Sequence, residues 1–446
     1  MLRPRELTIT SAIQLMRAGH LTSQDLVESC LERIHEREAT IRAWVGLYEK
    51  EALEEAQRCD KESRNGQWRG ELHGIPIGIK DIIHVKGMYT RAGSPIYPGH
   101  VAAHDAPAVE LLRAAGAIIL GKTETTPFAN ADPTITRNPR NPDHSPGGSS
   151  SGSAASVADW MCFAALGTQT GGSLLRPAAY CGIVGFKPTY GRISTGGIIP
   201  NSYSIDTVGI HARSVADAWI LCRHLIDKDP LPFARIPRTV VPTKKGSNSL
   251  PHLGRVRDVF EQDVSPEVAQ NLAYVLERLE RNGALLTDMQ LPESFSHVPN
   301  WWDIIKETEL ASYHRTLFES HGDQYPPKIK ARIEKGLRIP GYRYVEVLRK
   351  RIDFQQEMSE KLSVVDAAIM PTSSTTAPKG LSSTGSPVLN RPWSFCGFPA
   401  ISIPSGTNND GLPFAVQLVA QPMAEESLIN LASWCERVLN SKRNLP

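Results

Sequence analysis

The sequence lacks the features typical of disulfide-rich, zinc-binding, membrane, secreted and nucleic-acid-binding proteins. Its seven cysteines are odd in number and form no CxxC pair, so neither a disulfide framework nor a zinc ribbon is indicated. No apolar run approaches the roughly 18 residues of a membrane span, and the N-terminus lacks the apolar core of a secretory signal. A net charge of +2 gives no argument for nucleic acid or an anionic membrane surface. We therefore expect a cytoplasmic protein that binds neither nucleic acid nor membrane.

The histidines give no metal signature either. Neither H-E-x-x-H nor another paired metal spacing occurs among the 13 histidines. His84 and His144 lie near the segments discussed below, but isolated histidines of this kind are more often packed or surface residues. We expect no metal site.

Helical and strand-like segments alternate along most of the chain. Asp105 and Pro107 are typical of a helix start, Gly116 ends that helix, and an apolar strand over 117–120 follows. The same succession recurs over 265–286. Such alternation predicts an α/β fold in which helices cover both faces of a sheet.

Further segments complete this outline. A Pro-rich, basic stretch over 229–251 predicts a surface excursion, and residues 300–362 have an almost wholly helical pattern. The other expected elements are helices within 8–37, over 49–63 and over 425–439, and strands over 367–370, 400–404 and 415–418.

Residues 145–187 are the most distinctive part of the sequence. Two glycine–serine clusters, 147–152 and 171–173, flank a segment of small residues that fits one helix and one buried strand. Flexible linkers seldom run directly into such patterned, apolar segments. Glycine also lets a backbone approach a substrate closely and turn its N–H groups inward, as an oxyanion site requires.

Two well-known motifs match the sequence by letter but not by context. Residues 116–123 fit the phosphate-loop pattern G-x(4)-G-K-[ST], yet the variable positions are themselves an apolar strand whose amides would pair in a sheet. Residues 148–152 fit the nucleophile elbow G-x-S-x-G, although turn-forming residues rather than a buried strand precede it. An α/β-hydrolase-type esterase with Ser150 as nucleophile stays as a minor alternative.

Lys80 ends the apolar, strand-like run over 74–81. Burial there would disfavour the charged form and could lower the lysine pKa by up to about 3–5 units from about 10.4. A neutral lysine is a competent base for a serine hydroxyl. Because a lysine at a strand end more often extends to solvent, this position does not establish a base by itself.

Taken together, these segments closely resemble the amidase signature family. The family's GGSS[SG]GS and GT-x-TGGS-x-x-x-PA segments are matched by 147–153 and 167–178, and its GIP-x-x-x-KD segment by 74–81. Ser149 and Ser173 are separated by 24 positions (173 − 149), the family's usual spacing between its two catalytic serines.

The resemblance extends over most of the chain and is weakest over 225–360. It implies one domain over 1–446 with a central mixed sheet between helical layers. The signature core would span about 65–225 and 363–446, and a helical insertion over about 290–362 would determine the substrate.

The resemblance implies a Ser–Ser–Lys mechanism that needs no metal or organic cofactor. Ser173 would attack the carbonyl, Ser149 would pass its proton on, and Lys80 would be the base. Relatives hold the bridging serine in a cis peptide, which here would be Gly148–Ser149. Water would then hydrolyse the acyl-enzyme. The oxyanion hole would consist of the amides of Thr170, Gly171, Gly172 and Ser173.

Two further positions bear on the substrate and the site. Many relatives carry aspartate where this chain has Gln169, so no role of that carboxylate can be transferred. Trp301 and Trp302 are candidates for lining an apolar pocket, although paired aromatics in a helix are core residues more often than not.

The resemblance implies a small-molecule substrate with an amide, anilide, carbamate (urethane) or urea-like bond. The family also includes the glutamine-hydrolysing subunit of a tRNA amidotransferase, which acts with partner chains. Near-neutral charge and compact length favour a stand-alone hydrolase and leave a homodimer open. A catalytically silent scaffold of the same fold is the non-enzymatic alternative.

Overall fold

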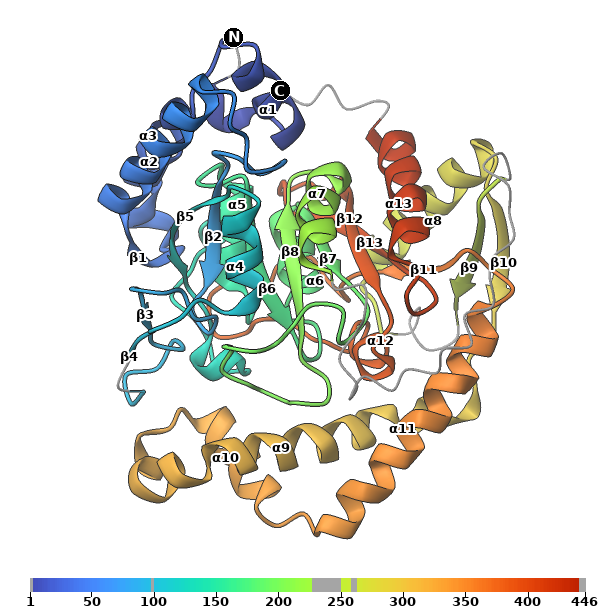
Figure 1. The fold of residues 1–446 in the computed structure, drawn as a ribbon. Helices are drawn as coiled ribbons and strands as arrows, with labels where there is room; N and C mark the ends of the chain where they lie inside the picture. The colour runs from blue at the N-terminus through green and yellow to red at the C-terminus, as the bar shows by residue number, and fades with distance from the viewer. Residues whose placement is uncertain (1–2, 98–99, 227–249, 258–262, 441–446) are drawn as a thin grey trace.

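The computed structural model describes residues 3–97, 100–226, 250–257 and 263–440. Apart from its last two residues, the surface excursion expected over 229–251 lies outside this part of the chain. At the centre of the molecule is an 11-stranded sheet (Figure 1). The α-helices are α1 (Ile9–Arg17), α2 (Ser23–Ile41), α3 (Glu49–Arg64), α4 (Pro107–Ala114), α5 (Ser151–Ala158), α6 (Leu175–Cys181), α7 (Val215–Leu225), α8 (Pro266–Arg281), α9 (Val298–His321), α10 (Pro327–Gly336), α11 (Gly341–Leu362), α12 (Arg391–Cys396) and α13 (Glu425–Asn440).

The central sheet is mixed, as expected. Along it the strands follow the order β1-β5-β2-β6-β8-β7-β12-β13-β11-β9-β10. Parallel pairs occur at β5–β2–β6 and at β11–β9–β10, with antiparallel pairs elsewhere. The strands are β1 (Trp44–Leu47), β2 (Pro76–Lys80), β5 (Ile118–Thr123), β6 (Ala164–Gln169), β7 (Val184–Lys187), β8 (Thr207–Ala212), β9 (His252–Val256), β10 (Leu285–Met289), β11 (Ala367–Pro371), β12 (Ala400–Thr407) and β13 (Pro413–Val419), and β3 (Tyr89–Thr90) pairs with β4 (His100–Val101) in a separate ribbon.

Local sequence signals account for the helix starts. Thr22 accepts the N–H of Asp25, and the Asp25 carboxylate accepts the N–H of Thr22, which is a capping box at the start of α2. Pro107 and Pro266 stand at the first helical positions of α4 and α8, where their missing N–H is harmless. The phosphate-loop pattern at 116–123 contains β5, whose buried residues pair with β1 and β2, so it is not a phosphate loop.

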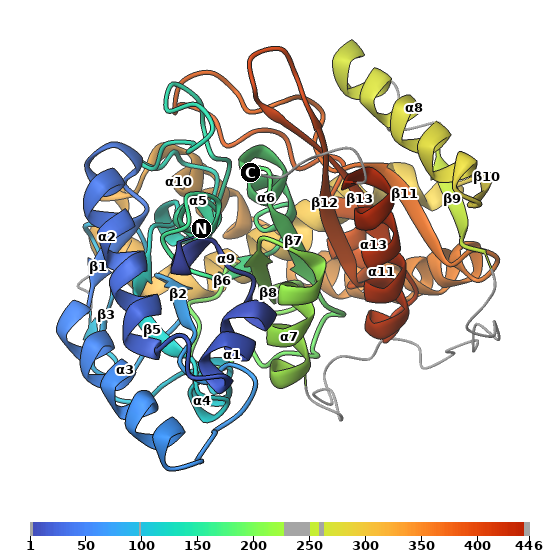
Figure 2. The ribbon, with the colours of Figure 1, turned by 90° about the horizontal axis from the view of Figure 1, so that it is seen from above.

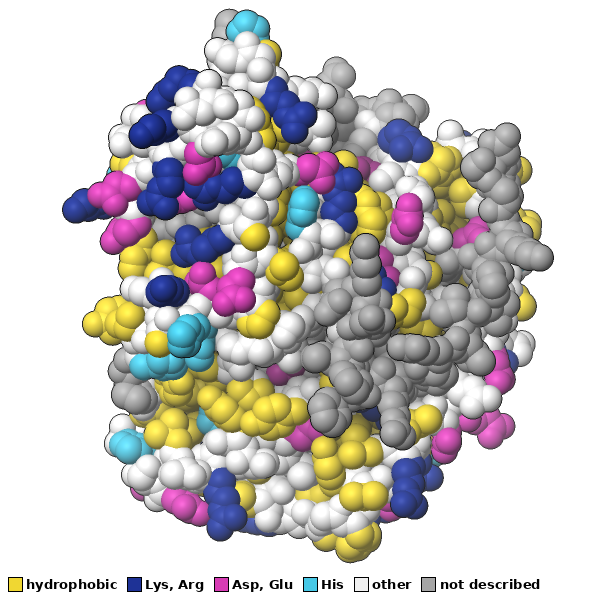
Figure 3. All heavy atoms as spheres, in the orientation of Figure 1, with side chains coloured by type: hydrophobic (Ala, Val, Ile, Leu, Met, Phe, Trp, Pro, Cys, Tyr) yellow, Lys and Arg dark blue, Asp and Glu magenta, His cyan; other side chains and the backbone are white. Residues whose placement is uncertain are grey.

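Helices lie on both faces of the sheet, as the alternation predicted. Helices α5 and α6 pack on one face, and α4, α7 and α13 pack on the other (Figure 2). A further layer of α9, α10 and α11 lies below the sheet body in Figure 1. In Figure 3, hydrophobic side chains form a band between this layer and the sheet body, while charged side chains of both signs are interspersed elsewhere on that face. Among the described helices, none is long and apolar enough to cross a membrane.

Strand register brings separate parts of the chain to one end of the sheet. The parallel strands β2 and β6 are aligned with Ile79 opposite Leu166, so their carboxyl ends lie side by side. Strand β8 runs antiparallel to β6 and begins with Thr207 opposite Gln169. As a result, Lys80, the end of β6 and the loop that precedes β8 meet at this edge.

Candidate active site

Lys80 lies fully buried at the end of β2. Its Nζ is 2.8 Å from Oγ of Ser149 and 2.8 Å from Oγ1 of Thr168. Burial lowers the pKa of Lys80 to about 7, and the negative charge of Asp206 partly opposes that shift. Slightly above neutral pH, the amine is therefore mostly uncharged and can accept a proton.

The first glycine–serine cluster precedes α5 and places two serines differently. The Gly148–Ser149 peptide is cis, and Ser149 turns its hydroxyl toward Lys80. Ser150 is fully buried, and its Oγ lies 3.2 Å from both the carbonyl oxygen and the amide nitrogen of Thr168. A hydroxyl enclosed by backbone in this way anchors α5 to β6, which argues against Ser150 as a nucleophile.

Ser173 lies next to this cluster although it is far away in the sequence. The Ser150 amide donates a hydrogen bond of 3.1 Å to the Ser173 carbonyl, so the two serine-bearing segments run side by side. Ser173 is partly exposed, while its neighbours Gly172 and Leu174 are buried. The fold thus brings Lys80, Ser149 and Ser173 into one region and leaves Ser173 accessible.

Gln169 holds the segment around Ser173 at both ends. Its Oε1 accepts the N–H groups of Leu174 and Leu175, each at 3.0 Å. Its Nε2 donates to Oγ of Ser394 at 3.0 Å, and that hydroxyl donates to the Gly171 carbonyl at 2.8 Å. A carboxylate at this position could accept the two N–H groups but could not donate to Ser394. The glutamine therefore has a structural role of its own.

Asp206 anchors the start of the second cluster. Oγ1 of Thr170 donates to its carboxylate at 2.5 Å, and the amides of Asn201 and Ser202 donate to the other carboxylate oxygen at 2.7 and 2.9 Å. Burial raises the pKa of Asp206 to about 6, so the group is mostly ionised at neutral pH. No role for Asp206 follows from the sequence, because nothing in its neighbourhood along the chain shows that the carboxylate faces Thr170.

Glu309 of α9 connects the helical layer to this loop. Its carboxylate accepts four hydrogen bonds: from the hydroxyls of Ser202 and Ser204, from the Ser204 amide at 3.0 Å, and from the Tyr344 hydroxyl of α11 at 2.7 Å. Glu309 is buried in a segment for which the sequence predicts only helix. The layer formed by 298–362 thus fixes the loop that carries Asp206.

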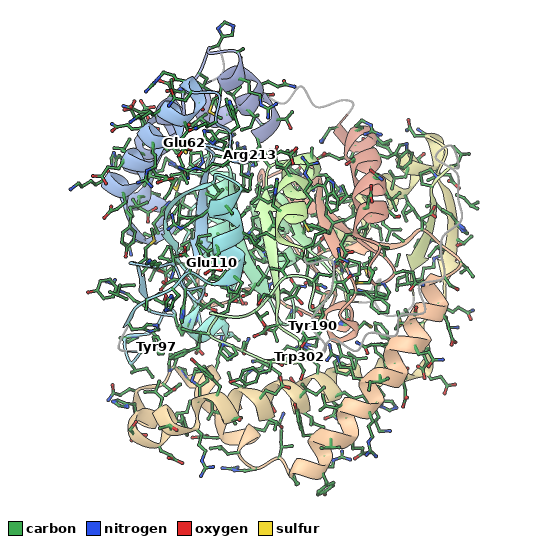
Figure 4. All side chains as sticks on the ribbon, in the orientation of Figure 1. Glu62, Tyr97, Glu110, Tyr190, Arg213 and Trp302 are labelled. Atoms are coloured by element: carbon green, nitrogen blue, oxygen red, sulfur yellow. The ribbon has the colours of Figure 1, made fainter. Side chains whose placement is uncertain are left out.

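The two adjacent tryptophans of α9 point to different places. Trp302, labelled in Figure 4, donates from Nε1 to the Thr170 carbonyl at 3.1 Å, and its ring lies against Gly171. Trp301 instead stacks on Phe395 and lines a separate open cavity of about 430 Å³ beside Lys350. Consecutive helix residues project about 100° apart, which explains the separation. Only Trp302 belongs to the region of the serines.

One group of described residues is close enough together to hold a metal ion, and it consists of Cys59, Glu62 and His73. Both oxygens of Glu62 already bind the guanidinium of Arg69, at 2.7 and 2.6 Å. Nε2 of His73 lies 3.0 Å from Oγ of Ser63 and 3.0 Å from the Cys59 carbonyl. These contacts make the group a structural cluster that is separate from Lys80, Ser149 and Ser173.

Comparison with known proteins adds the following findings. The family model described as Amidase matches residues 25–429. A glutamyl-tRNA(Gln) amidotransferase subunit from Chloroflexus aurantiacus is 34% identical over 473 residues, covering 97% of this chain and 96% of the relative. A crystal structure of an amidase superposes with a TM-score of 0.86 at 30% identity, covering 97% of this chain and 100% of the other. The peptide amidase of Stenotrophomonas maltophilia gives a TM-score of 0.81 at 28% identity, with 98% of each chain covered.

Proposed function

This chain belongs to the amidase signature family of hydrolases that act on carbon–nitrogen bonds, and from that premise we propose that it hydrolyses a small amide, anilide, carbamate or urea-like substrate through an acyl-enzyme on Ser173. The observation that carries this proposal is the 2.8 Å contact between Nζ of the buried Lys80 and Oγ of Ser149. A lysine with a pKa of about 7 in contact with a hydroxyl can take up and return a proton at neutral pH.

The proposed cycle has two halves. Oγ of Ser173 attacks the substrate carbonyl, its proton passes to Ser149, and Ser149 passes its own proton to the uncharged amine of Lys80. The ammonium returns a proton through Ser149 to the leaving nitrogen, which departs as a neutral amine or ammonia. Water then attacks the acyl-enzyme and passes a proton through Ser149 to Lys80. That proton returns to Oγ of Ser173 as the bond to the acyl group breaks, which releases the acid and restores the serine hydroxyl.

The contacts of two carbonyl groups support an oxyanion hole formed by the amides of residues 170–173. In a trans peptide the C=O of one residue points opposite to the N–H of the next. The Thr170 carbonyl binds Trp302 and the Gly171 carbonyl binds Ser394, so the N–H groups of Gly171 and Gly172 are turned to the other side. Donors fixed in this way stabilise the negative charge that develops on the substrate oxygen.

We also propose that residues 1–446 act as one domain in which α9, α10 and α11 cover the site, because Trp302 and Glu309 of α9 bind the segments around it. All seven cysteines are buried and unpaired, which supports a cytoplasmic enzyme. A role as the glutamine-hydrolysing component of an amidotransferase is the second candidate, since the name of the Chloroflexus aurantiacus relative places it in such an enzyme.

A substrate screen tests the proposal directly. Purified protein is assayed on amides, anilides, carbamates, ureas and glutamine, with the Ser173→Ala variant as blank. We expect turnover that Ser173→Ala abolishes. A serine-reactive phosphonate should label Ser173, and labelling of Ser150 would instead favour the esterase alternative. Equal rates for both proteins on every substrate would support the catalytically silent scaffold, and copurification with partner chains would favour the amidotransferase.

A further inference from the structure

Helix α11 packs on the molecule with one face and carries large apolar side chains on the opposite face as well. The inward face holds Val347, Phe354 and Met358, which are buried. In Figure 1 the helix forms the lower outer edge of the helical layer. On its outer side Tyr342 is 71% exposed and Ile352 is 49% exposed. Single exposed apolar residues are common on protein surfaces, so the arrangement of these side chains decides what they mean.

The exposed outer side chains follow the spacing of a coiled-coil seam. They succeed one another at intervals of three, four, three and four positions: Tyr342, Val345, Arg349, Ile352 and Gln356. Two seam positions in every seven residues keep such side chains in one stripe that packs against a second helix. This stripe lies opposite the buried face of α11, and its exposure shows that no described helix of the same chain covers it. The geometry therefore fits a helix from another molecule.

The charges of this face indicate which molecule supplies that helix. Arg349 lies in the stripe and Asp353 beside it, both are exposed, and within the described part of the chain neither forms an ion pair. Their neighbours Arg343 and Glu346 already pair with each other at 2.8 Å. A second copy of α11 in the antiparallel direction brings each Arg349 close to the other copy's Asp353. A parallel copy would instead place like charges opposite each other, which is unfavourable.

We propose that the protein forms a homodimer in which the α11 helices of two copies pack antiparallel about a two-fold axis. In the register that pairs the charges, Ile352 packs on the partner's Arg349, whose guanidinium binds Asp353, and Val345 packs on the partner's Gln356. The contact is self-complementary, as a two-fold interface requires, because every pair occurs twice. An arginine within an otherwise apolar seam also fixes the register and the direction of the helices.

Sedimentation velocity tests this interface. A seam of five side chains is short of the roughly 20–30 residues per partner in a standard interface, so we expect a dimer that forms between about 1 and 100 µM. Over that range the wild-type mass should rise from 49.0 kDa to twice that value. Ile352→Asp, which puts a carboxylate into the seam, should stay monomeric. Leu285→Asp is the matched control, because Leu285 is a similarly exposed apolar residue (55%) on the edge strand β10, and it should dimerise as the wild type does.

Charge reversal tests the direction of the helices. Arg349→Asp and Asp353→Arg should each weaken the dimer, because like charges then face each other across the axis. The variant with both substitutions restores opposite charges only in an antiparallel pair, so it should dimerise again. Circular dichroism checks that each variant is folded, which we expect because both side chains are exposed.

Three results would overturn the proposal. The first is a wild-type protein that is still monomeric at about 100 µM, whether this face then binds another protein, a lipid surface or nothing. The second is a dimer that Ile352→Asp leaves intact, since that dimer would use another surface. The third is a monomeric double charge variant, which would exclude the antiparallel register. None of these measurements involves substrate, so the outcome is independent of the proposed hydrolysis.

Discussion

Replacing Lys80 by methionine should remove the acid limb of the pH–rate profile. With a pKa of about 7, the amine is about one-tenth uncharged at pH 6 and about nine-tenths uncharged at pH 8. Only the uncharged amine can accept the proton, so wild-type kcat/KM should rise about tenfold from pH 6 to its plateau. Loss of a general base costs about 10²–10⁴-fold in rate, and the residual activity of Lys80→Met should show no limb near pH 7.

The effect of the same substitution on stability distinguishes lost chemistry from lost folding. The pKa of Lys80 is lower in the folded protein than the 10.5 of the free side chain, so between pH 7 and 10.5 the unfolded chain binds more protons. The penalty for burying this amine is therefore largest below pH 7 and diminishes as the pH rises. At pH 8 the substitution by methionine removes a burial penalty of about 3 kcal/mol. The loss of the two hydrogen bonds to Ser149 and Thr168 offsets about 1 kcal/mol each of that gain in stability. Lys80→Met should accordingly unfold at no lower temperature than the wild type.

Lys187 provides a matched control. It is also fully buried, and burial lowers its pKa to about 7. Among the described residues, however, its Nζ donates only to the carbonyls of Pro188 and Phe398 and binds no serine. Stopped-time assays of kcat/KM from pH 5.5 to 9 should show the acid limb in Lys187→Met and not in Lys80→Met. Lys80 is not the base if kcat/KM of Lys80→Met stays within about threefold of the wild-type value, or if the acid limb is lost in Lys187→Met and kept in Lys80→Met.

Three further predictions concern side chains that position the site. Gln169→Glu should lower kcat about tenfold because the donor to Ser394 is lost. Ser394→Ala should lower kcat by a similar factor. If the two losses were fully additive in the variant that carries both substitutions, the two side chains would not act through their shared contact. Trp302→Phe should lower kcat by a similar factor because the hydrogen bond from the indole N–H to the Thr170 carbonyl is lost. Trp301→Phe should leave kcat unchanged. Equal effects of the two substitutions on kcat would show that this N–H does not matter. Glu309→Gln should reduce the free energy of unfolding by about 1–3 kcal/mol, measured by urea denaturation; an unchanged midpoint would mean that its four hydrogen bonds add no net stability.

Much of the fold was predictable because its signals are local. The capping box at Thr22 and the prolines at 107 and 266 mark helix starts through contacts within one turn. Alternating helices and strands led to a sheet with helices on both faces, which the structure confirms. The two glycine–serine clusters and the lysine segment over 74–81 led to the family through their resemblance to its motifs, and the comparisons confirm that family.

The surroundings of the reacting groups were not predictable, because they come from strand register and helix packing. Asp206 binds Thr170 and Glu309 binds the 201–204 loop, each across a long sequence separation.

The sequence by itself determined the family and hence hydrolysis of carbon–nitrogen bonds as the class of chemistry, because the motifs that resemble the family, including those of the proposed Ser–Ser–Lys site, lie in short, local segments. Tertiary structure decided what surrounds them. Burial at the end of β2 lowers the pKa of Lys80 to about 7, so that its amine can act as a base near neutral pH. The packing of α9 places Trp302, and not Trp301, against the Thr170 carbonyl. Both outcomes depend on desolvation and contact between distant segments, which no local pattern encodes.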